Sequence, residues 1–191
     1  MRIKLENIAT VQAGYSFRSR LESLESGAVA VIQMKDLTSA NRVCCDKLVR
    51  VDMEMPKAHH LVRPGDLVFR SRGLTSNSAL LMDDPGAAVL AAPLVRIRVT
   101  SAAVLPEYLN WTISQLPAQS YLASCAEGTA LKMISKQSLE NLELFIPSLG
   151  RQRFVVEMAA LAAEEERILK ALAEKRQQYI AATLVQLTQG E

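Results

Sequence analysis

The chain has 191 residues, of which 49% are hydrophobic and 22% are charged, and its formal net charge is +2. This composition supports a packed core and excludes a disordered or polybasic chain, so a nucleic-acid surface would have to be a local arrangement. No apolar run reaches the roughly 20 residues of a membrane helix, and the N-terminal MRIKLEN lacks the apolar centre of a signal peptide.

Short strands and turns are predicted for the first half of the chain. Residues 6–12 are predicted to form one or two helical turns that end at Gly14, and residues 16–27 are predicted to form a polar loop with Arg18 and Arg20. The apolar or alternating runs predicted as strands are residues 3–5, 28–32, 43–51, 67–71 and 79–82. Turn sequences, RPGD at 63–66 and DDPG at 83–86, separate the later ones.

Residues 94–99 have the clearest strand pattern of the chain. The aliphatic side chains at 95, 97 and 99 alternate with Arg96 and Arg98. Alternation of this kind is typical of a strand with one buried face.

Helices and two further strands are predicted after residue 100. The predicted helices are 107–116, with Pro106 in the first turn, 118–124, and 136–141, with Ser135 as the N-cap. The predicted strands are 131–134 and 142–146. These elements together predict an α+β fold for residues 1–147, as a compact mixed domain of short strands and helices.

The C-terminal part has a different composition. Residues 151–185 contain neither Gly nor Pro and consist mostly of strong helix formers. About 35 residues at 1.5 Å each give a helix of about 50 Å. Residues 148–191 are therefore predicted to form one long helix for dimerisation, and the family resemblance described below implies that this helix also docks a partner subunit.

A heptad stripe runs along this predicted helix. The stripe residues are Phe154, Met158, Leu161, Glu165, Ile168, Leu172, Lys175 and Tyr179. A single helix cannot bury such a stripe, which predicts a partner helix, and the alternative left open is that the helix folds back on its own domain. In an antiparallel homodimer with its two-fold axis near Lys170, Glu165 would face Lys175 of the other copy, and the charges would select that register.

Metal and catalytic sites find little support in the sequence. Cys44–Cys45 and His59–His60 are adjacent pairs, and neighbouring residues on a strand point to opposite faces, so neither pair chelates as C-x-x-C does. The odd count of three cysteines, which includes Cys125, argues against disulfides and favours a cytoplasmic protein. The G-x-S-x-G, G-x-G-x-x-G and P-loop motifs are missing. We therefore predict no catalytic residue, no metal and no cofactor.

Side chains that suit DNA cluster in the middle of the chain. Arg70 and Arg72 alternate and lead into the polar segment GLTSNS, residues 73–78. Arg can bind guanine with two hydrogen bonds and Asn can bind adenine, while Ser and Thr suit phosphates or bases. One interpretation is a local basic groove that also involves Arg96, Arg98 and Lys132, and the alternative left open is a solvated sheet face.

Several segments together give a family resemblance. They are LENIATVQAGYSF at 5–17, PGDLVFRSRG at 64–73, LVRIRV at 94–99, PEYL at 106–109, GTA at 128–130 and LELFIPSL at 142–149. On these segments and their order the chain resembles the specificity (S) subunit of type I restriction–modification systems, with one target-recognition domain and one conserved-region helix. Where the family has Pro-Pro-Leu and then Glu-Gln, only Gln152 keeps the pattern, and typical members carry two domains and two helices.

The resemblance implies a half-length, non-catalytic subunit that pairs its helix with a second copy. The implied partners are double-stranded DNA with a palindromic, interrupted target, the methyltransferase (M) subunit and, as an open option, the restriction (R) subunit, without a membrane. The residues expected to read bases are Arg70, Arg72, Thr75, Ser76 and Asn77, and those expected nearer the phosphates are Arg18, Arg20 and Lys132. Two alternatives stay open: a stand-alone dimeric DNA-binding regulator, and an interaction scaffold that no longer binds DNA.

Overall fold

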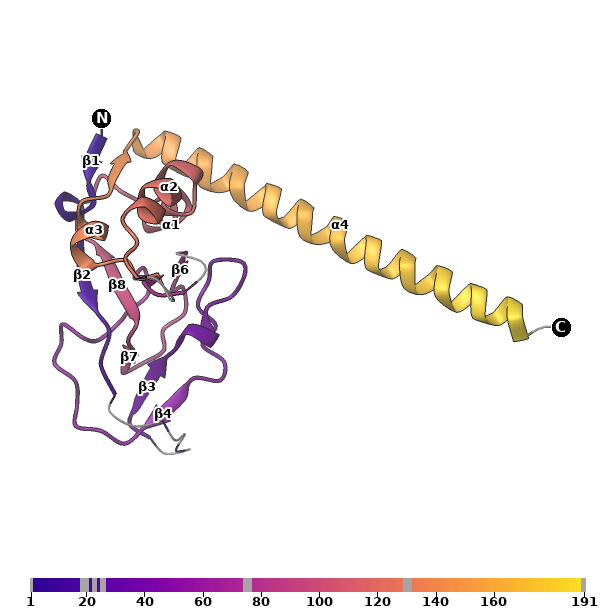
Figure 1. Ribbon diagram of the computed structural model, residues 1–191, viewed down its shortest axis with the longest axis horizontal. Coiled ribbons are helices and arrows are strands. Elements are labelled where there is room, and N and C mark those ends of the chain that lie inside the picture. The colour runs from indigo at the N-terminus through magenta and orange to yellow at the C-terminus, as the bar shows by residue number, and fades with distance from the viewer. Residues whose placement is uncertain are drawn as a thin grey trace. The chain divides into compact units, whose positions relative to one another are not determined.

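The computed structural model describes residues 2–17, 21, 24, 27–73, 77–128 and 132–189. The chain divides into two compact units, one that ends at Gln152 and one that begins at Arg153. The first, here called the α+β unit, contains all the strands of the described residues, and the second is a continuous stretch of one long helix (Figure 1). The predicted α+β class with a long C-terminal helix is confirmed.

The elements are short except for the last helix. The strands are β1 (Arg2–Lys4), β2 (Ala9–Ala13), β3 (Val29–Ile32), β4 (Val49–Val51), β5 (Leu67–Arg70), β6 (Ser78–Leu80), β7 (Ala88–Leu90), β8 (Leu94–Val99) and β9 (Glu143–Phe145). The helices are the 3-10 turns η1 (Leu5–Asn7) and η2 (Met34–Asp36), and α1 (Pro106–Ile113), α2 (Leu116–Ser124), α3 (Lys136–Glu140) and α4 (Leu149–Gln189).

A four-stranded antiparallel sheet forms the centre of the α+β unit. Its strand order is β2-β8-β5-β6, with Val11 opposite Ile97 and Leu67 opposite Ile97 on the other side. One face of this sheet packs against α1, α2 and α3 in a core that includes Phe69, Leu109 and Leu122. Within the strand predicted for residues 94–99, Val95 and Ile97 therefore point into this core, and Arg96 and Arg98 point to the opposite face of the sheet.

A second sheet covers the opposite face of the first. It has the order β4-β3-β7, in which β3 and β7 are parallel and β4 is antiparallel. Ala30 and Ile32 of β3 face the four-stranded sheet, whereas Val29 and Val31 face an outer cluster that includes Tyr15. Burial on both faces explains why β3 is a continuous apolar run rather than an alternating one.

Three predictions about the elements were wrong. Residues 6–12 were predicted as helical turns, but only η1 is helical, and β2 then pairs along the whole of its length with β8. Of the strand predicted for 43–51, only β4 is a strand. Residues 132–134 make isolated bridges through Met133 instead of the predicted strand, and β7 was not predicted. Each of these depends on pairing between distant segments, which local sequence preferences do not encode.

Helix starts were predicted more accurately than the short strands. Pro106 occupies the first turn of α1, and the Ser135 Oγ accepts a hydrogen bond of 3.0 Å from the Ser138 N–H at the start of α3. Proline lacks the N–H that a first turn leaves unpaired, and a serine cap satisfies one such group. Local rules of this kind do not require a distant partner.

Gln152 joins the first turn of α4 to the α+β unit. Its side chain is fully buried, and its Nε2 donates to the carbonyl oxygens of Ala103 (2.7 Å) and Pro147 (2.8 Å). Its Oε1 accepts from the Leu105 N–H at 2.9 Å. The one residue that keeps the family pattern at this point thus closes the turn before α1 with a complete set of hydrogen bonds.

Candidate nucleic-acid interface and dimerisation helix

The chain beyond β5 pairs with the segment that contains Lys132. Beyond β5, Arg72 forms an antiparallel bridge with Met133. The Gly73 N–H donates to the Lys132 carbonyl at 3.3 Å, and the Ile134 N–H donates to the Ser71 carbonyl at 2.8 Å. The segments that flank residues 74–76 and 129–131 therefore lie side by side, and both Arg72 and Lys132 are exposed.

Gly73 is required at this position by its backbone. Its φ of 132° lies in a region that side chains with a Cβ rarely adopt. Because Gly73 directly follows the Arg72 bridge, it turns the chain from the sheet into the polar segment. The conformation of the turn thus helps to fix where Arg72 is presented.

Arg70 is less free than Arg72. One guanidinium N–H donates to the Met34 carbonyl of η2 at 3.0 Å, and the side chain is half-buried. Its buried Nε has no partner among the described residues. Arg70 therefore ties η2 to the end of β5, and only part of its guanidinium is available to a ligand.

Asn77 belongs to a network of amides beneath the polar segment. Its Nδ2 donates to the Asn41 Oδ1 at 3.4 Å, and the Asn110 Nδ2 donates to the Asn41 carbonyl at 3.1 Å. The Ser78 Oγ donates to the Asn110 Oδ1 at 2.8 Å, and both of these residues are buried. The network fixes the C-terminal end of the polar segment to α1 and to the turn that contains Asn41.

Asn41 and Asn110 were not predicted from the sequence. Asn41 has a φ of 55°, a conformation that Asn tolerates better than most residues, and it follows the turn-forming residues TSA. That signal could have marked a turn, but not its contact with α1. Asn110 gave no signal, because a polar residue in a helix is usually exposed.

Arg96 and Arg98 have a structural role instead of lining a basic groove. Arg98 makes two hydrogen bonds, of 2.6 and 2.7 Å, to the carboxylate of the fully buried Asp66. Arg96 and Arg98 each donate to the Leu61 carbonyl at 3.0 Å. The face that they share is covered by the segment around Leu61, so it is neither a DNA groove nor a solvated face.

The charge states of these two arginines follow from their surroundings. The hydrogen bonds that Arg98 donates to Asp66 raise the pKa of Arg98. Burial, and then the neighbouring charge of Arg98, lowers the pKa of Arg96. A buried carboxylate that accepts two N–H bonds from one guanidinium is a strong, geometrically defined pair. The pair fixes the 61–66 segment against β8.

The remaining predicted DNA contacts lie outside the described residues. These residues are Arg18, Arg20, Thr75 and Ser76. Of the eight predicted positions, the described ones are Arg70, Arg72, Asn77 and Lys132. Arg72 and Lys132 lie on paired segments, one residue out of register, because Arg72 is opposite Met133.

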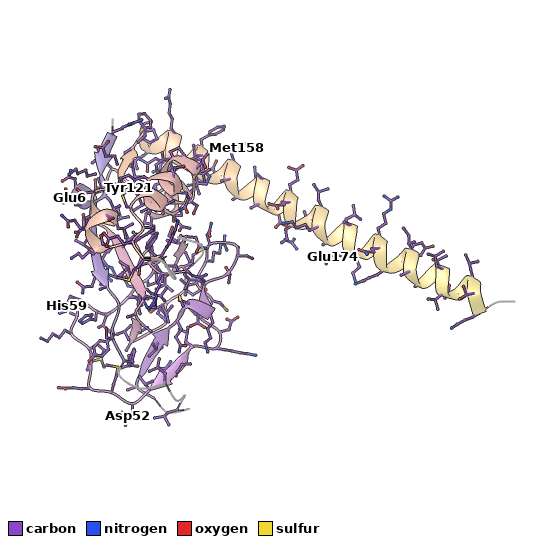
Figure 2. All side chains as sticks on the ribbon, viewed as in Figure 1. Glu6, Asp52, His59, Tyr121, Met158 and Glu174 are labelled. Atoms are coloured by element: carbon purple, nitrogen blue, oxygen red, sulfur yellow. The ribbon has the colours of Figure 1, made fainter. Side chains whose placement is uncertain are left out.

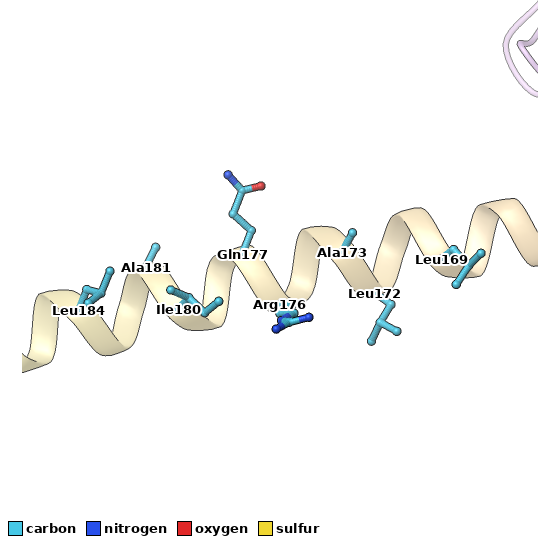
Figure 3. A pocket seen from close by; sticks show the side chains of 8 residues that line it. All are labelled: Leu169, Leu172, Ala173, Arg176, Gln177, Ile180, Ala181 and Leu184. Atoms are coloured by element: carbon cyan, nitrogen blue, oxygen red, sulfur yellow. The ribbon is translucent and has the colours of Figure 1, made fainter.

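The apolar side chains of α4 are exposed in the single chain. Leu161, Leu172 and Tyr179 expose 66%, 63% and 74% of their surface. Figure 2 labels Met158 and Glu174 on this helix, and Figure 3 shows the apolar groove that includes Leu169, Leu172 and Ile180. A row of exposed leucines and isoleucines on one helix face is typical of a surface that binds a partner helix.

The described part of the chain has neither a cluster of metal ligands nor a membrane-spanning helix. No group of three His, Cys, Asp or Glu side chains there lies close enough together to hold a metal ion. No helix of the described residues is long and apolar enough to cross a membrane.

Comparison with known proteins finds similar solved structures but no match to a family model or a curated protein. The structure is similar to the HsdS subunit from Thermoanaerobacter tengcongensis, with a TM-score of 0.67 and 19% identity over 89% of this chain. It is also similar to a chain from a study of complex assembly and conformational transition in the type I restriction–modification system, with a TM-score of 0.71 and 18% identity over 92%.

A third similar structure is the type I restriction–modification S subunit from M. genitalium, with a TM-score of 0.60 and 11% identity over 93% of this chain. The chain spans only 39%, 41% and 42% of the three solved chains, in the order given. The fold is therefore that of one part of an S subunit, a mixed domain followed by a long helix, as the sequence segments predicted.

Proposed function

We propose that this chain is a sequence-specific DNA-binding specificity subunit of a type I restriction–modification system. It is non-catalytic and acts as an antiparallel homodimer that directs methyltransferase and restriction subunits to a split palindromic target. The observation that carries the proposal is the match of about nine tenths of this chain to about two fifths of each S subunit. One domain and one helix correspond to half of an arrangement that a second copy would complete.

The exposed face of α4 supports the homodimer. Leu161, Leu172 and Ile180 are about half or more exposed in the single chain, and burying them against a partner is favourable by about 25 cal/mol per Å² of apolar surface. Two identical subunits related by a two-fold axis would present two identical half-sites. The spacer between the half-sites would then follow from the length of the paired helices.

The residues around the end of β5 support DNA binding. Arg72 and Lys132 lie on adjacent paired segments, both exposed, and Arg70 and Asn77 lie next to them in the sequence. We assign Arg72 to the interface as the cation with the greatest freedom to reach a base or a phosphate. Lys132 is assigned to the phosphate backbone, together with Arg18 and Arg20, while Thr75 and Ser76 are assigned to base reading.

Selection from a randomised duplex pool tests the target. The purified chain is incubated with the pool, and the bound duplexes are sequenced. The proposal requires enrichment of two inverted, identical half-sites with a fixed spacer. Enrichment of one unrepeated half-site would contradict the palindromic target, and the absence of any enrichment would favour a scaffold that does not bind DNA.

Salt titrations with the selected duplex test the assigned cations. Each lost phosphate contact reduces the magnitude of the slope of log affinity against log salt by about 1. Lys132→Ala should therefore reduce this slope by about 1 for each bound subunit. Lys57→Ala, which removes an exposed lysine elsewhere in the α+β unit, is the matched control. Equal slopes for the two variants would remove Lys132 from the interface. Co-purification with an M subunit distinguishes a specificity subunit from a stand-alone regulator.

A further inference from the structure

The apolar face of α4 repeats every 11 residues. The two rows that show the repeat are Met158, Leu169 and Ile180, and Leu161, Leu172 and Thr183. An 11-residue repeat corresponds to about 3.67 residues per turn, close to the 3.6 of a straight helix. Side chains at this spacing therefore stay on one face of the 41-residue helix with less supercoiling than a strict heptad needs.

A third row on the same face contains two charges. Phe154, Glu165, Arg176 and Leu187 also follow one another at 11-residue intervals, with the charged residues at its centre. Arg176 lines the apolar groove shown in Figure 3. Charged side chains in the middle of an apolar face are costly to bury unless each meets an opposite charge.

Some neighbouring charges on α4 are paired within the helix, but Glu165 and Arg176, like Glu174, form no ion pair in the described residues. Glu164 binds Arg167 at 2.6 Å, and Glu166 forms an ion pair with Lys170. The Lys175 Nζ donates to the Gln178 Oε1 of the next turn at 3.4 Å. Within residues 132–189 and the other described parts of the chain, neither Glu165 nor Arg176 forms an ion pair, and both are exposed.

The rows are symmetric about the midpoint between Lys170 and Ala171. Two antiparallel copies centred there place Glu165 opposite Arg176, Leu169 opposite Leu172, and Leu161 opposite Ile180. We infer that a second copy of this chain occupies the apolar face of α4 in this register, with Glu165 of each copy paired to Arg176 of the other. The inference rests on the homodimer proposed above and specifies its register.

Charge excludes the competing arrangements. A shift by one 11-residue repeat in one direction puts Glu165 opposite Glu165 of the other copy, and a shift in the other direction puts Arg176 opposite Arg176. Parallel pairing in register creates both clashes at once. Like charges placed opposite each other in a partly buried interface are strongly unfavourable, so among these arrangements the centred antiparallel register alone gives both residues an opposite charge.

The heptad register predicted from the sequence is offset from this one by one residue along the helix. It pairs Glu165 with Lys175, whereas the 11-residue repeat pairs Glu165 with Arg176. Lys175 is hydrogen-bonded on its own helix and does not line the groove, in contrast to Arg176. Arg is also the better partner in an interface, because its planar guanidinium binds a carboxylate with two hydrogen bonds.

Sedimentation equilibrium of the full chain and three variants tests the register. Arg176→Glu should raise the dimer dissociation constant by about 100-fold, because the two-fold axis creates two like-charge contacts in each dimer. The double variant Glu165→Arg with Arg176→Glu should restore the dissociation constant to within about 10-fold of the original. Lys175→Glu is the matched control on the same turn and should change it by less than about 3-fold.

The outcomes separate the register from the proposed function. A monomeric parent chain at every concentration would overturn the homodimer and the register together. A dimer that survives Arg176→Glu but is lost with Lys175→Glu would overturn the register and leave the homodimer standing. Helix content by circular dichroism confirms that each variant keeps α4, and binding of the selected duplex reports on the α+β unit independently.

Discussion

Two arginine–carboxylate pairs, one in the α+β unit and one on α4, have the same separation and opposite surroundings. Arg98 and Asp66 approach to 2.6 Å with side chains 20% and 1% exposed, and Arg167 and Glu164 approach to 2.6 Å with side chains 67% and 53% exposed. The first pair holds two segments together within a core, and the second lies on the exposed surface of a helix. The distance between two charges therefore says little about their contribution until their burial is known.

The same contrast extends to the apolar side chains. The α+β unit buries its large aliphatic residues in three clusters and also buries polar groups such as Gln152 and Asn110. On α4 the leucines and isoleucines are exposed. The α+β unit thus buries its large aliphatic residues within one chain, whereas α4 leaves its apolar face exposed in the single chain. Four predictions test this difference, and the chain's single tryptophan, Trp111 on α1, reports on the α+β unit alone.

Removing Asp66 should have the largest effect. Asp66→Ala leaves Arg98 without its carboxylate partner and the Arg63 N–H without its acceptor, so the free energy of unfolding of the α+β unit should fall by about 4 kcal/mol. Urea denaturation followed by Trp111 fluorescence measures this. Glu164→Ala, which breaks the exposed pair at the same distance, should leave the denaturation curve unchanged, and similar losses in both variants would refute the distinction by burial.

Gln152→Ala should lower the free energy of unfolding of the α+β unit by about 3 kcal/mol. The substitution leaves the carbonyls of Ala103 and Pro147 and the Leu105 N–H without partners in a buried site. The same denaturation measurement detects the loss. Gln186→Ala removes an exposed glutamine of α4 and serves as the control, and a tolerated Gln152→Ala would mean that water replaces the amide.

Two glycine substitutions should have effects of opposite sign. A Cβ at Gly14 would lie 2.7 Å from the Leu94 carbonyl oxygen and 2.8 Å from that of Leu90, so Gly14→Ala should destabilise the α+β unit by about 2 kcal/mol. A Cβ at Gly150 in the first turn of α4 meets nothing within 4 Å, so Gly150→Ala should stabilise by about 0.5 kcal/mol. Thermal unfolding compares both variants with the parent chain, and effects of the same sign would contradict the difference in packing.

Acidification should affect the two regions in separate pH windows. Burial, and then the nearby charges of His59, Arg96 and Lys57, lowers the pKa of His60 below the 6.5 of a free histidine. Below that value the unfolded chain takes up a proton that the folded chain resists, so the stability of the α+β unit decreases as the pH falls from about 7 to about 5.5. His60 is partly exposed and screened by solvent, so the decrease should be about 0.5 kcal/mol or less.

His60→Gln should remove the decrease in stability of the α+β unit below pH 7. Comparison of this variant with the parent chain above pH 7 is the control. On α4, the hydrogen bonds from Arg167 and Lys170 lower the pKa values of Glu164 and Glu166 below the usual 4.5 of a glutamate. Their stabilisation is present above that value and is lost only as the pH falls further. Helix content by circular dichroism should therefore stay constant between pH 7 and about pH 5.5, where urea denaturation followed by Trp111 shows the decrease, and helix loss in that window would contradict the assignment.

Sequence patterns predicted the elements whose residues alternate or repeat strongly. The β8 strand was predicted to its exact ends, and α4 was predicted to within a few residues, because both patterns extend over several repeats. The β2 strand was missed, since its five residues mix small, polar and apolar types and its stability comes from pairing with β8. Its alternation of buried Ala9 and Val11 is too short to outweigh local helical preference.

The candidate DNA interface was predictable only in part. The polar segment after β5 and its basic flanks can be found from residue types, but the pairing of Arg72 with Met133 could not, because it joins segments about 60 residues apart in the chain. The roles of Arg96 and Arg98 could not be found, because the Asp66 that binds Arg98 lies on the covering segment. Side chains that alternate on a strand identify a face, but the segment that covers the face depends on tertiary structure.

The pairing of β1 with β9 joins the two ends of the α+β unit. Arg2 lies opposite Phe145, so β1 finds its neighbour only after almost the entire α+β unit has been synthesised. Such distant pairing is slow relative to local helix formation. Because α4 follows β9 in the chain, its exposed apolar face emerges after the described strands, so the sheets of the α+β unit can begin to close before that face is available to other chains.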